Sequence, residues 1–463
     1  MSARRMNGLR AAAAVIAAAA IVAVAAPAHA LNIKRMKLSD GAILLVSEQH
    51  RLPMVTLSIA FDAGARRDPV GKEGLAELTA ESLAQGTKTL TANEFNQKVD
   101  FMGSSIGVAA GRDYATAGFT SLKKYEGATL KLLAGILAEP GLRDADIERK
   151  RAEQVAGIKA AQEQPGYVAD VAFDKALFGA DSPYGHPTEG YADSAAKLTP
   201  GEVRTFYREH YRMGDAVIAV AGDVTAAEIK AALEKELAAL PGGAPAPEAV
   251  PAAPAIAPGL HPKLIDRNVE QANIALGFGG IDRANPDYYR LQVMNYILGG
   301  GGFASRLMKI VRTKEGLAYS INSGFDAGKF PGSFSVVLQT KNRSANQALE
   351  LILQQLRKIQ EQPVTDAELQ SAKKFLVGSF PLKYDRLSSI ASFMQQVELY
   401  GLGLDYAGKY PSLIQSVTKE GVLNVAKKYL HPGSILLVAV ANQKEAKIDT
   451  AKLAHLVAGA ASN

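Results

Sequence analysis

The feature that most constrains the fold is a proline- and alanine-rich stretch in the middle of the chain. Residues 240–262 read LPGGAPAPEAVPAAPAIAPGLHP. Because proline lacks a backbone donor and fixes φ, this composition predicts an extended, semi-rigid linker with neither helix nor strand ladder. The chain of 463 residues is therefore expected to fold as two units, over residues 31–240 and 263–463, joined by a linker over residues 241–262.

The two units look like distant copies of each other. A helix is expected to begin at Asp144, shortly after a Glu-Pro pair, and another at Asp366, shortly after a Gln-Pro pair. Each unit then continues with a helix and a short apolar strand, over residues 199–211 and 216–221 in the first unit and over residues 418–429 and 435–441 in the second. The order and spacing agree within a few residues, which predicts a duplication.

Strands and helices are mixed within each unit. Short or alternating apolar runs predict strands, and a period of 3.6 residues predicts helices. The clearest strand candidates are residues 42–47, 55–61 and 333–339, and the clearest helix candidates are residues 128–138, 346–359 and 367–376. Since there is no strict βαβ alternation, we expect an α+β fold in which helices pack against a largely antiparallel sheet. Two such units would close around a substrate like a clamshell.

The first thirty residues have the pattern of a secretory signal peptide. Three arginines precede an apolar run over residues 11–26, and Ala28-His29-Ala30 forms a small-x-small cleavage site. A retained membrane anchor is the alternative, but the run is shorter than the roughly 20 residues that a membrane span needs. We therefore expect residues 1–30 to be removed and the mature chain to be periplasmic or secreted. The choice between the general and the twin-arginine export routes stays open.

Composition excludes several classes of function. The formal net charge is only +6, and three of the arginines lie in the expected signal peptide, so there is no case for nucleic-acid binding. No other apolar stretch is long enough to predict stable membrane insertion. The chain has no cysteine, which excludes disulfides, thiolate zinc sites and cysteine nucleophiles. A chain of this size does not need disulfides in an oxidising compartment, so export remains compatible.

Residues 63–87 carry the frame of a metal-binding helix without its ligands. They read AGARRDPVGKEGLAELTAESLAQGT. The segment resembles that of the M16 (pitrilysin or insulinase-like) metallopeptidases, in which a glycine-arginine turn leads into a helix carrying His-x-x-Glu-His, followed by Gly-Thr. At the positions of the two histidines and the catalytic glutamate this chain has Glu77, Glu81 and Ala80.

The resemblance covers nearly the whole mature chain. Residues 177–190 contain LFG and SPYGHP and are similar to a loop between two helices of the family's first half. Residues 298–307, LGGGGFASRL, and 312–320, RTKEGLAYS, resemble the family's glycine-rich loop and its Arg/Tyr segment. The resemblance implies two homologous M16-like α/β sandwich domains that form one half of a clamshell.

The resemblance also implies that this chain has lost its metal. Zinc requires nitrogen, sulfur or carboxylate donors, and a His pair at i, i+4 places two imidazoles on one helix face. The family's third ligand, a glutamate, should fall near Gly157. The seven histidines all lie outside the expected helix, at positions His29, His50, His186, His210, His261, His431 and His455. We therefore expect neither a metal nor another cofactor in this chain.

Two interpretations of the glutamates in the expected helix stay open. Glu77 and Glu81 are one turn apart, so they could bind a metal as a carboxylate pair. Carboxylates at this spacing are common on helices, and a solvated or salt-bridged pair with Arg66, Arg67 or Lys72 is favoured.

In the second unit the resemblance assigns catalytic roles to Arg312 and Tyr319. Arg312 would hold a backbone carbonyl of the substrate, and Tyr319 would donate its hydroxyl to the oxyanion, a contact whose loss typically costs about 3–4 kcal/mol. Gly316 would end the helix that carries Arg312. The glycine-rich loop would let the substrate backbone approach closely through Gly299, Gly300, Gly301, Gly302 and Phe303.

Simpler alternatives exist for each of these features. An arginine late in a helix is commonly solvated, where it complements the helix dipole. A tyrosine in an apolar strand commonly packs in the core, and a glycine run commonly forms a flexible turn. The run lacks the Gly-Lys-Ser/Thr ending of a phosphate-binding loop.

The resemblance implies that two chains together form one active site. M16 heterodimers such as the mitochondrial processing peptidase contain one zinc-bearing and one zinc-free subunit. We expect this chain to be the zinc-free subunit of an exported M16B peptidase, with a zinc-bearing M16 homologue as partner and an extended peptide as substrate. The alternatives are a structural or assembly subunit, as in the core of the cytochrome bc1 complex, and a homodimeric peptide-binding pseudoenzyme.

Overall fold

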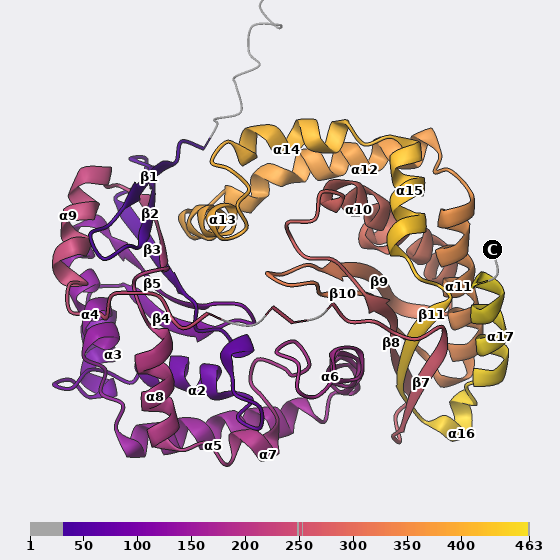
Figure 1. The fold of residues 1–463 in the computed structure, drawn as a ribbon, viewed down its shortest axis with the longest axis horizontal. Coiled ribbons are helices and arrows are strands. Elements are labelled where there is room, and N and C mark those ends of the chain that lie inside the picture. The colour runs from indigo at the N-terminus through magenta and orange to yellow at the C-terminus, as the bar shows by residue number, and fades with distance from the viewer. Residues whose placement is uncertain (1–30, 248–249, 252, 462–463) are drawn as a thin grey trace, which may run out of the picture.

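Two α+β domains lie side by side in this computed structural model (Figure 1), which describes residues 31–247, 250–251 and 253–461. The expected signal peptide, residues 1–30, lies outside the described residues. Within the described part of the chain, no helix combines the length and the apolar character needed to cross a membrane.

The first domain is built on a six-stranded sheet with the order β1-β2-β6-β3-β5-β4. Its neighbouring strands are antiparallel except for the parallel pair β2 and β6. The strands are β1 (Lys34–Lys37), β2 (Ile43–Glu48), β3 (Met54–Phe61), β4 (Ser105–Ala110), β5 (Ala115–Leu122) and β6 (Val217–Gly222). The helices are α2 (Leu75–Leu83), α3 (Ala92–Phe101), α4 (Glu126–Ala138), α5 (Asp144–Ala161), α6 (Pro165–Phe178), α7 (Ala192–Ala195), α8 (Pro200–His210) and α9 (Ala226–Glu236).

The second domain is built on a five-stranded sheet with the order β7-β11-β8-β10-β9. Only the pair β7 and β11 is parallel. The strands are β7 (Gly259–Asp266), β8 (Gln271–Gly279), β9 (Ala318–Asp326), β10 (Ser333–Lys341) and β11 (Ser434–Ala441). The helices are α10 (Tyr288–Asn295), α11 (Ala345–Glu361), α12 (Asp366–Ser379), α13 (Leu387–Leu399), α14 (Tyr406–Gln415), α15 (Lys419–Tyr429), α16 (Gln443–Ala446) and α17 (Thr450–Ala461).

The sheet topologies confirm the predicted duplication. Without the extra edge strand β1, the first sheet has the order β2-β6-β3-β5-β4, and each strand has a counterpart in the order β7-β11-β8-β10-β9. In both sheets the parallel pair joins the first two strands of this order. The predicted strands and helices named above all occur, with ends that differ by at most three residues.

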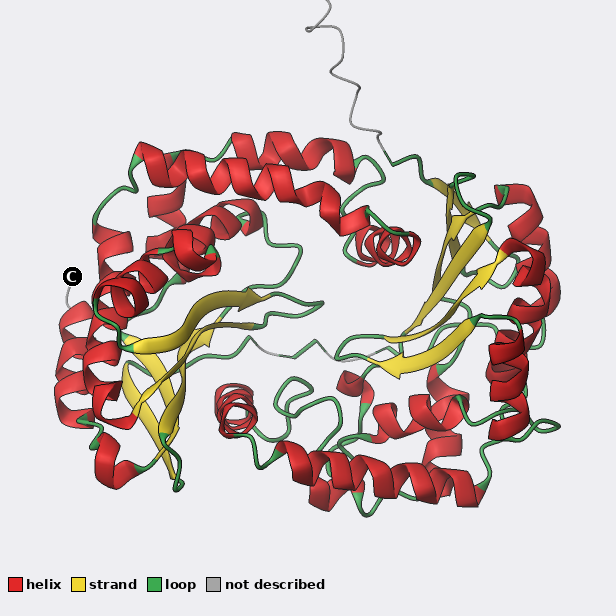
Figure 2. Ribbon diagram, turned by 180° about the vertical axis from the view of Figure 1, so that it is seen from behind, coloured by secondary structure: helices red, strands yellow, loops and turns green. Residues whose placement is uncertain are grey.

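The two domains exchange a helix. Helix α6 of the first domain packs on β8 and β11 of the second, and α13 of the second domain packs on β3 and β6 of the first (Figures 1 and 2). These contacts explain why β6 (VIAVAG) is buried at every residue and β11 (SILLVAVA) at all but its first. A strand that is covered on both faces has a continuous apolar sequence instead of an alternating one.

Polar contacts reinforce the exchange of α13. The Gln395 side chain donates from Nε2 to the backbone carbonyls of Ser58 and Val217, at 3.1 Å each. Arg35 binds the Glu398 carboxylate through Nε and Nη2. Since each sheet needs a helix of the other domain to cover its inner face, the two domains form one interlocked body.

The predicted linker extended too far toward the C-terminus. Residues 259–262 were assigned to it, but they form the first half of β7, which pairs with β11 along its whole length. Pro262 is tolerated there because β7 is an edge strand, where a missing backbone donor leaves no neighbour unpaired.

Candidate functional site

Helix α2 presents the degenerate metal motif inside the first domain. Ala80 is fully buried, whereas Glu77 and Glu81 are half-buried one turn apart. Burial, together with the negative charges of Glu81 and Glu189, raises the pKa of Glu77. The motif positions therefore hold a small apolar residue and two carboxylates that repel each other.

The basic residues that we expected beside these glutamates have other carboxylate partners. Arg66 and Arg67 both bind Asp62, and the ammonium nitrogen of Lys72 lies 2.6 Å from Glu202 on α8. The charges that raise the pKa of Glu77 are instead those of the carboxylates of Glu81 and Glu189.

Helix α5 offers no third ligand at the expected position. Gly157 is exposed, and a side chain added there would meet no atom within 4 Å. Gln154 of α5, which was not predicted as a site residue, reaches the start of α2. Its amide nitrogen donates to the carbonyls of Gly74 and Glu189 at 3.0 and 2.8 Å. In the described residues no group of three His, Cys, Asp or Glu side chains could hold a metal ion. The residues present do not fit zinc, which takes three or four protein ligands.

The glycine-rich turn follows α10 in the second domain. A π-helical turn over Tyr296–Gly300 leads into a 3-10 turn over Gly302–Ala304. Gly299 is buried, and a β-carbon there would lie 2.4 Å from the hydroxyl and 2.7 Å from the backbone nitrogen of Ser323. Glycine at this position therefore allows the turn to pack directly on β9.

The remaining glycines shape the exposed tip of the turn. A β-carbon on Gly301 would lie 2.5 Å from the carbonyl oxygen of Tyr296, and Gly302 has a φ of +54°. The hydroxyl of Ser305 donates to the Gly302 carbonyl at 2.7 Å and fixes this conformation. Gly300, Gly302 and Phe303 are exposed, so they stay candidates for substrate contact.

Arg312 lies between two aromatic rings. It belongs to a π-helical turn over Met308–Lys314, and Gly316, with a φ of +64°, separates this turn from β9 as predicted. The guanidinium carbon is 5.0 Å from the ring centre of Phe303 and 5.9 Å from that of Tyr319. Among the described residues Arg312 forms no ion pair with a carboxylate. Its Nη1 donates to the sulfur of Met308 at 3.9 Å, and the ring faces attract the cation without occupying its other N–H donors.

Tyr319, at the start of β9, is exposed over 70% of its surface. This exposure excludes the alternative that the residue serves core packing. Phe303 is similarly exposed, at 68%, and the two rings flank Arg312 at the surface. The structure therefore brings the predicted Arg/Tyr pair together with the tip of the glycine-rich turn.

An ion pair that the sequence analysis did not identify holds this region to α12. Arg306 binds the Glu368 carboxylate with two hydrogen bonds, of 2.7 and 2.9 Å. Partial burial opposes ionisation of Glu368, but these bonds and the backbone N–H of Thr365 hold its pKa at about 2. The available signal was the Thr-x-x-Glu capping box at residues 365–368, which predicts the start of α12.

The turn between β9 and β10 connects the site to the first domain. Tyr184, from the SPYGHP segment, donates its hydroxyl proton to Asp113 at 2.5 Å and accepts the backbone N–H of Phe330 at 3.2 Å. The backbone N–H of Lys329 donates to the same carboxylate at 2.9 Å. Burial and the Asp113 carboxylate raise the pKa of Tyr184. We call these four residues the interdomain latch.

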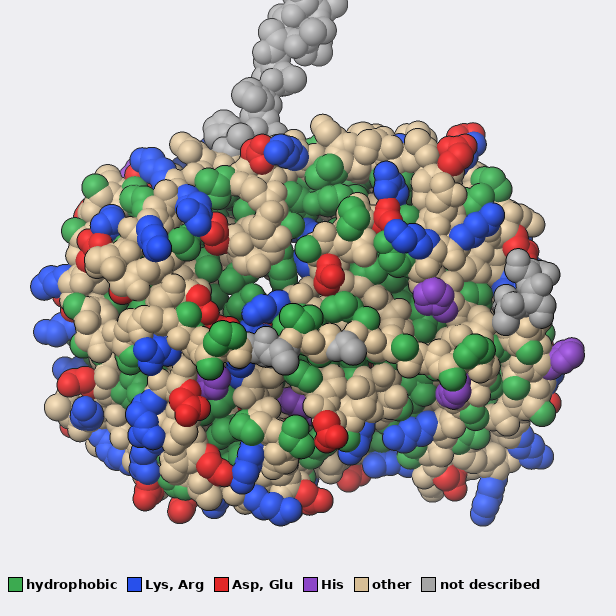
Figure 3. All heavy atoms as spheres, in the orientation of Figure 1, with side chains coloured by type: hydrophobic (Ala, Val, Ile, Leu, Met, Phe, Trp, Pro, Cys, Tyr) green, Lys and Arg blue, Asp and Glu red, His purple; other side chains and the backbone are tan. Residues whose placement is uncertain are grey.

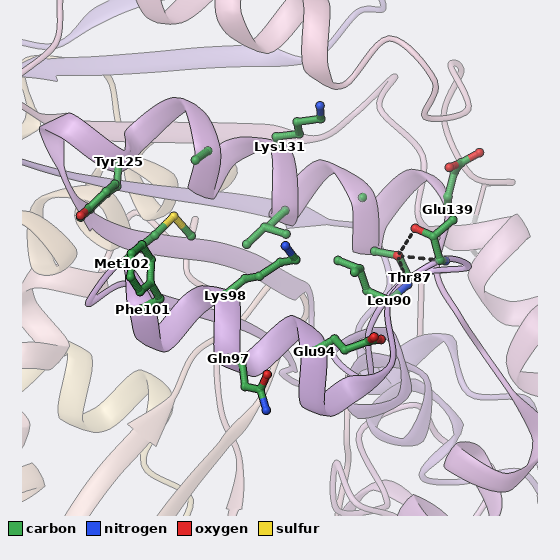
Figure 4. Close-up of a pocket in the computed structure, with 14 residues that line it drawn as sticks. Thr87, Leu90, Glu94, Gln97, Lys98, Phe101, Met102, Tyr125, Lys131 and Glu139 are labelled. Atoms are coloured by element: carbon green, nitrogen blue, oxygen red, sulfur yellow. Dashed lines mark hydrogen bonds between the residues drawn. The ribbon is translucent and has the colours of Figure 1, made fainter.

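Another cavity lies away from these residues. A groove of about 1010 Å³ runs between α3 and α4 of the first domain (Figure 4). Its lining includes Lys98, Phe101 and Lys131, and none of the predicted site residues. Acidic and basic side chains are interspersed on the face seen in Figure 3, where the domains leave a small central opening.

Comparison with known families and structures identifies the fold. Residues 44–181 match the family described as Insulinase (Peptidase family M16), and residues 197–376 match the Peptidase M16 inactive domain. The solved structure of a peptidase M16 inactive domain from Pseudomonas fluorescens is 30% identical, with a TM-score of 0.82 over 89% of this chain and 98% of that chain. The chain belongs to the M16 peptidase family. The second half of this M16 chain matches the inactive domain of the family, and the motif positions of its first half hold Glu77, Ala80 and Glu81.

Some relatives of this M16 chain are named as proteases and another is named as a non-peptidase. The "Non-peptidase homolog YmxG" of Helicobacter pylori is 26% identical over 405 residues, which cover 87% of this chain and 93% of that protein. An "Uncharacterized zinc protease YmxG" of Bacillus subtilis is 24% identical over 398 residues, which cover 85% and 93%. The crystal structure of a Helicobacter pylori protease shares the fold, with a TM-score of 0.81 and 18% identity over 88% of this chain and 99% of that chain.

Proposed function

We propose that this chain is the zinc-free subunit of an exported heterodimeric M16B peptidase. A zinc-bearing M16 homologue would be its partner and would supply the metal and the general base. This chain would supply Arg312, Tyr319 and half of the chamber in which an extended peptide is hydrolysed. The observation that carries the proposal is a half-buried Arg312 beside an exposed Tyr319, on a chain whose own motif positions do not fit zinc.

The geometry of the pair suits a developing negative charge. Arg312 offers guanidinium donors that no carboxylate of the described chain occupies, and Tyr319 offers a phenolic hydroxyl at the surface. Closure by a second chain would remove water from both groups, and donors held in place in a dry site act far more strongly than in water. Arg312 would bind a backbone carbonyl of the peptide, and Tyr319 would donate its hydrogen bond to the oxyanion.

The interlocked domains support a chamber shared by two chains. Within this chain the exchanged helices and the interdomain latch hold the domains together. A peptide would therefore enter by opening between this chain and its partner.

The sheet edges offer a place for an extended peptide. Strand β4 is an edge strand of the first sheet, and β9 is an edge strand of the second. A peptide strand added to either edge would gain main-chain hydrogen bonds. On β9 the amide of Asn295 already donates to the carbonyl of Ser323 at 3.0 Å. Strand β4 lies beside α2 and borders a groove of about 400 Å³ that residues of α13 also line.

The proposal is tested by co-expressing the chain with a zinc-bearing M16 homologue of the same organism and measuring cleavage of a fluorogenic peptide library. The pair should cleave peptides, whereas the isolated chain should not. The substitution Tyr319→Phe should lower kcat by about 10²–10³-fold, because one oxyanion donor is lost. The control Tyr125→Phe, on the rim of the α3–α4 groove, should leave turnover unchanged.

Two results would overturn the proposal. Stoichiometric, tightly bound zinc in the isolated chain would contradict a zinc-free subunit. Equal turnover by the pair with and without the Tyr319 hydroxyl would remove the catalytic role and favour an assembly subunit.

Export is tested separately by determining the N-terminus of the protein from the periplasmic fraction. A mature chain that starts at Leu31 is the expected result, and an intact N-terminus in the cytoplasm would refute this part of the proposal.

A further inference from the structure

A second cavity lies directly behind the glycine-rich turn. It has a volume of about 250 Å³ and is bounded by α10, the π-helical turn that ends at Gly300, strand β9 and helix α12. Cavities that hold whole small-molecule ligands are commonly larger, from about 300 to 1,000 Å³. The size therefore suits a single large side chain. Its walls are formed mainly by Tyr288, Leu291, Tyr296, Phe325, Phe375 and Leu376.

The amide side chains of this cavity are already paired. No acidic, basic or histidine side chain lines it. Its two amide side chains bind within the protein: Gln292 bonds to the hydroxyls of Tyr288 and Tyr410, at 3.1 and 3.3 Å, and Asn295 exchanges two hydrogen bonds with Ser323. A charged ligand group would lose its hydration without a compensating partner, whereas an apolar group gains from burial.

The mouth of the cavity is open to solvent. Phe375 is exposed over 54% of its surface, and its ring centre lies 5.0 Å from that of Tyr296. Gly300 is exposed at the same cavity, and a β-carbon there would come within 2.6 Å of the Asn295 amide. An exposed phenylalanine beside an apolar cavity is a surface that binding can cover.

The cavity is adjacent to the Arg/Tyr pair. Gly300 lines it, and Phe303, three residues later, packs on Arg312. Three residues span at most about 11 Å, and the ring centre of Phe303 lies a further 5.0 Å from the guanidinium carbon, so cavity and guanidinium lie within the length of about six residues of an extended peptide. A peptide whose carbonyl is held by Arg312 can therefore place a nearby side chain in the cavity.

We propose that this cavity, which we call the apolar subsite, selects the peptide substrate. It takes one large apolar side chain, such as Leu, Met or Phe, within about six residues of the peptide group held by Arg312. It disfavours Asp, Glu, Lys and Arg at that position. This inference rests on the proposed function, since it assigns the substrate class of the same site.

The test uses the reconstituted pair and peptides that differ at one position. A positional scan first identifies the residue where Leu is preferred over Ala. The substitution Phe375→Ala should then lower kcat/KM for the Leu peptide about tenfold and leave the Ala peptide within about twofold, so that the preference collapses. Gly324→Val should have the same effect by narrowing the cavity, because Gly324 lines it and a β-carbon there meets no atom within 4 Å.

The matched control is Leu382→Ala. Leu382 is 68% exposed in the turn that follows α12, and it lies outside the apolar subsite. This variant should keep the full preference for Leu, and equal melting temperatures of the variants would show that folding is unchanged.

The outcomes separate this inference from the proposed function. If the pair cleaves peptides but Phe375→Ala keeps the Leu preference, the apolar subsite is refuted and the proposed function stands. If the pair cleaves nothing, the proposed function fails. Binding of labelled Leu and Asp peptides to the isolated chain, measured by fluorescence anisotropy, then decides the subsite: equal affinities would overturn it, and a Leu preference lost in Phe375→Ala would support it.

Discussion

Replacing Tyr184 by phenylalanine should loosen the contact between the two domains without creating a cavity. The substitution removes only the hydroxyl, which is the one group of this side chain that bridges the domains through hydrogen bonds. The ring keeps its edge contact with Phe178, at 5.8 Å between centres. Any effect therefore reports on the hydrogen bonds of the interdomain latch.

The magnitude follows from the two bonds that are lost. The bond from Tyr184 to the Asp113 carboxylate is short, at 2.5 Å, and a bond to a charged acceptor contributes about 1.5–3 kcal/mol. The buried N–H of Phe330 loses its acceptor, which costs about 1–3 kcal/mol. Asp113 keeps the backbone donor of Lys329. We expect a total loss of about 2–4 kcal/mol, since water can replace part of these contacts.

The assay is hydrogen exchange of the purified mature chain, combined with urea unfolding. In Tyr184→Phe the amides of residues 327–332 should exchange faster, because the β9–β10 turn is released from the first domain. The control Tyr207→Phe removes a hydroxyl that donates to the Leu137 carbonyl at 2.6 Å within the first domain, so it should leave exchange of the turn unchanged. Unchanged exchange in Tyr184→Phe, with less than about 0.5 kcal/mol of destabilisation, would refute the latch.

Three further predictions concern stability. Glu368→Gln should lower the free energy of unfolding by about 2 kcal/mol at pH 7. The folded-state pKa of about 2 lies below the ordinary 4.5, so urea unfolding should show the full difference above about pH 5 and a smaller one as the pH falls toward 2. Burial raises the pKa of Asp174 to about 6, so its ionised form opposes folding, and Asp174→Asn should raise the melting temperature at pH 8 but not at pH 4. Gly299→Ala should destabilise the protein by about 1–3 kcal/mol, because the new methyl group overlaps β9. In the control Gly127→Ala, in α4, the new methyl group meets no atom within 4 Å, so stability should be unchanged or higher. Thermal unfolding distinguishes the two variants.

Local features were predictable because they depend on neighbouring residues. The apolar runs of β3 and β10 and the periodicity of α11 gave strand and helix positions close to those observed. The duplication was also visible, because the same order of helices and strands recurs at similar spacing. The start of β7 was missed because its proline- and alanine-rich composition does not indicate that the segment pairs with β11 as an edge strand.

Contacts between distant segments were not predictable in this way. The apolar face of α6 shows that the helix is covered, but not that a sheet of the other domain covers it. In the same way, Tyr184 was noticed in its motif, yet its partners Asp113 and Phe330 are far away in sequence. Gln154, which donates to the backbone at the start of α2, carried no signal beyond its position on a predicted helix.

The sequence by itself determined the chemistry that α2 lacks. A zinc site needs particular donor atoms, and with Glu77, Ala80 and Glu81 at the motif positions no packing can restore the missing histidines. Only the tertiary structure decided that Arg312 and Tyr319 are available for binding. Exposure and the position of a guanidinium between two rings depend on how the glycine-rich turn packs on β9, which is a contact between segments that the sequence does not place side by side.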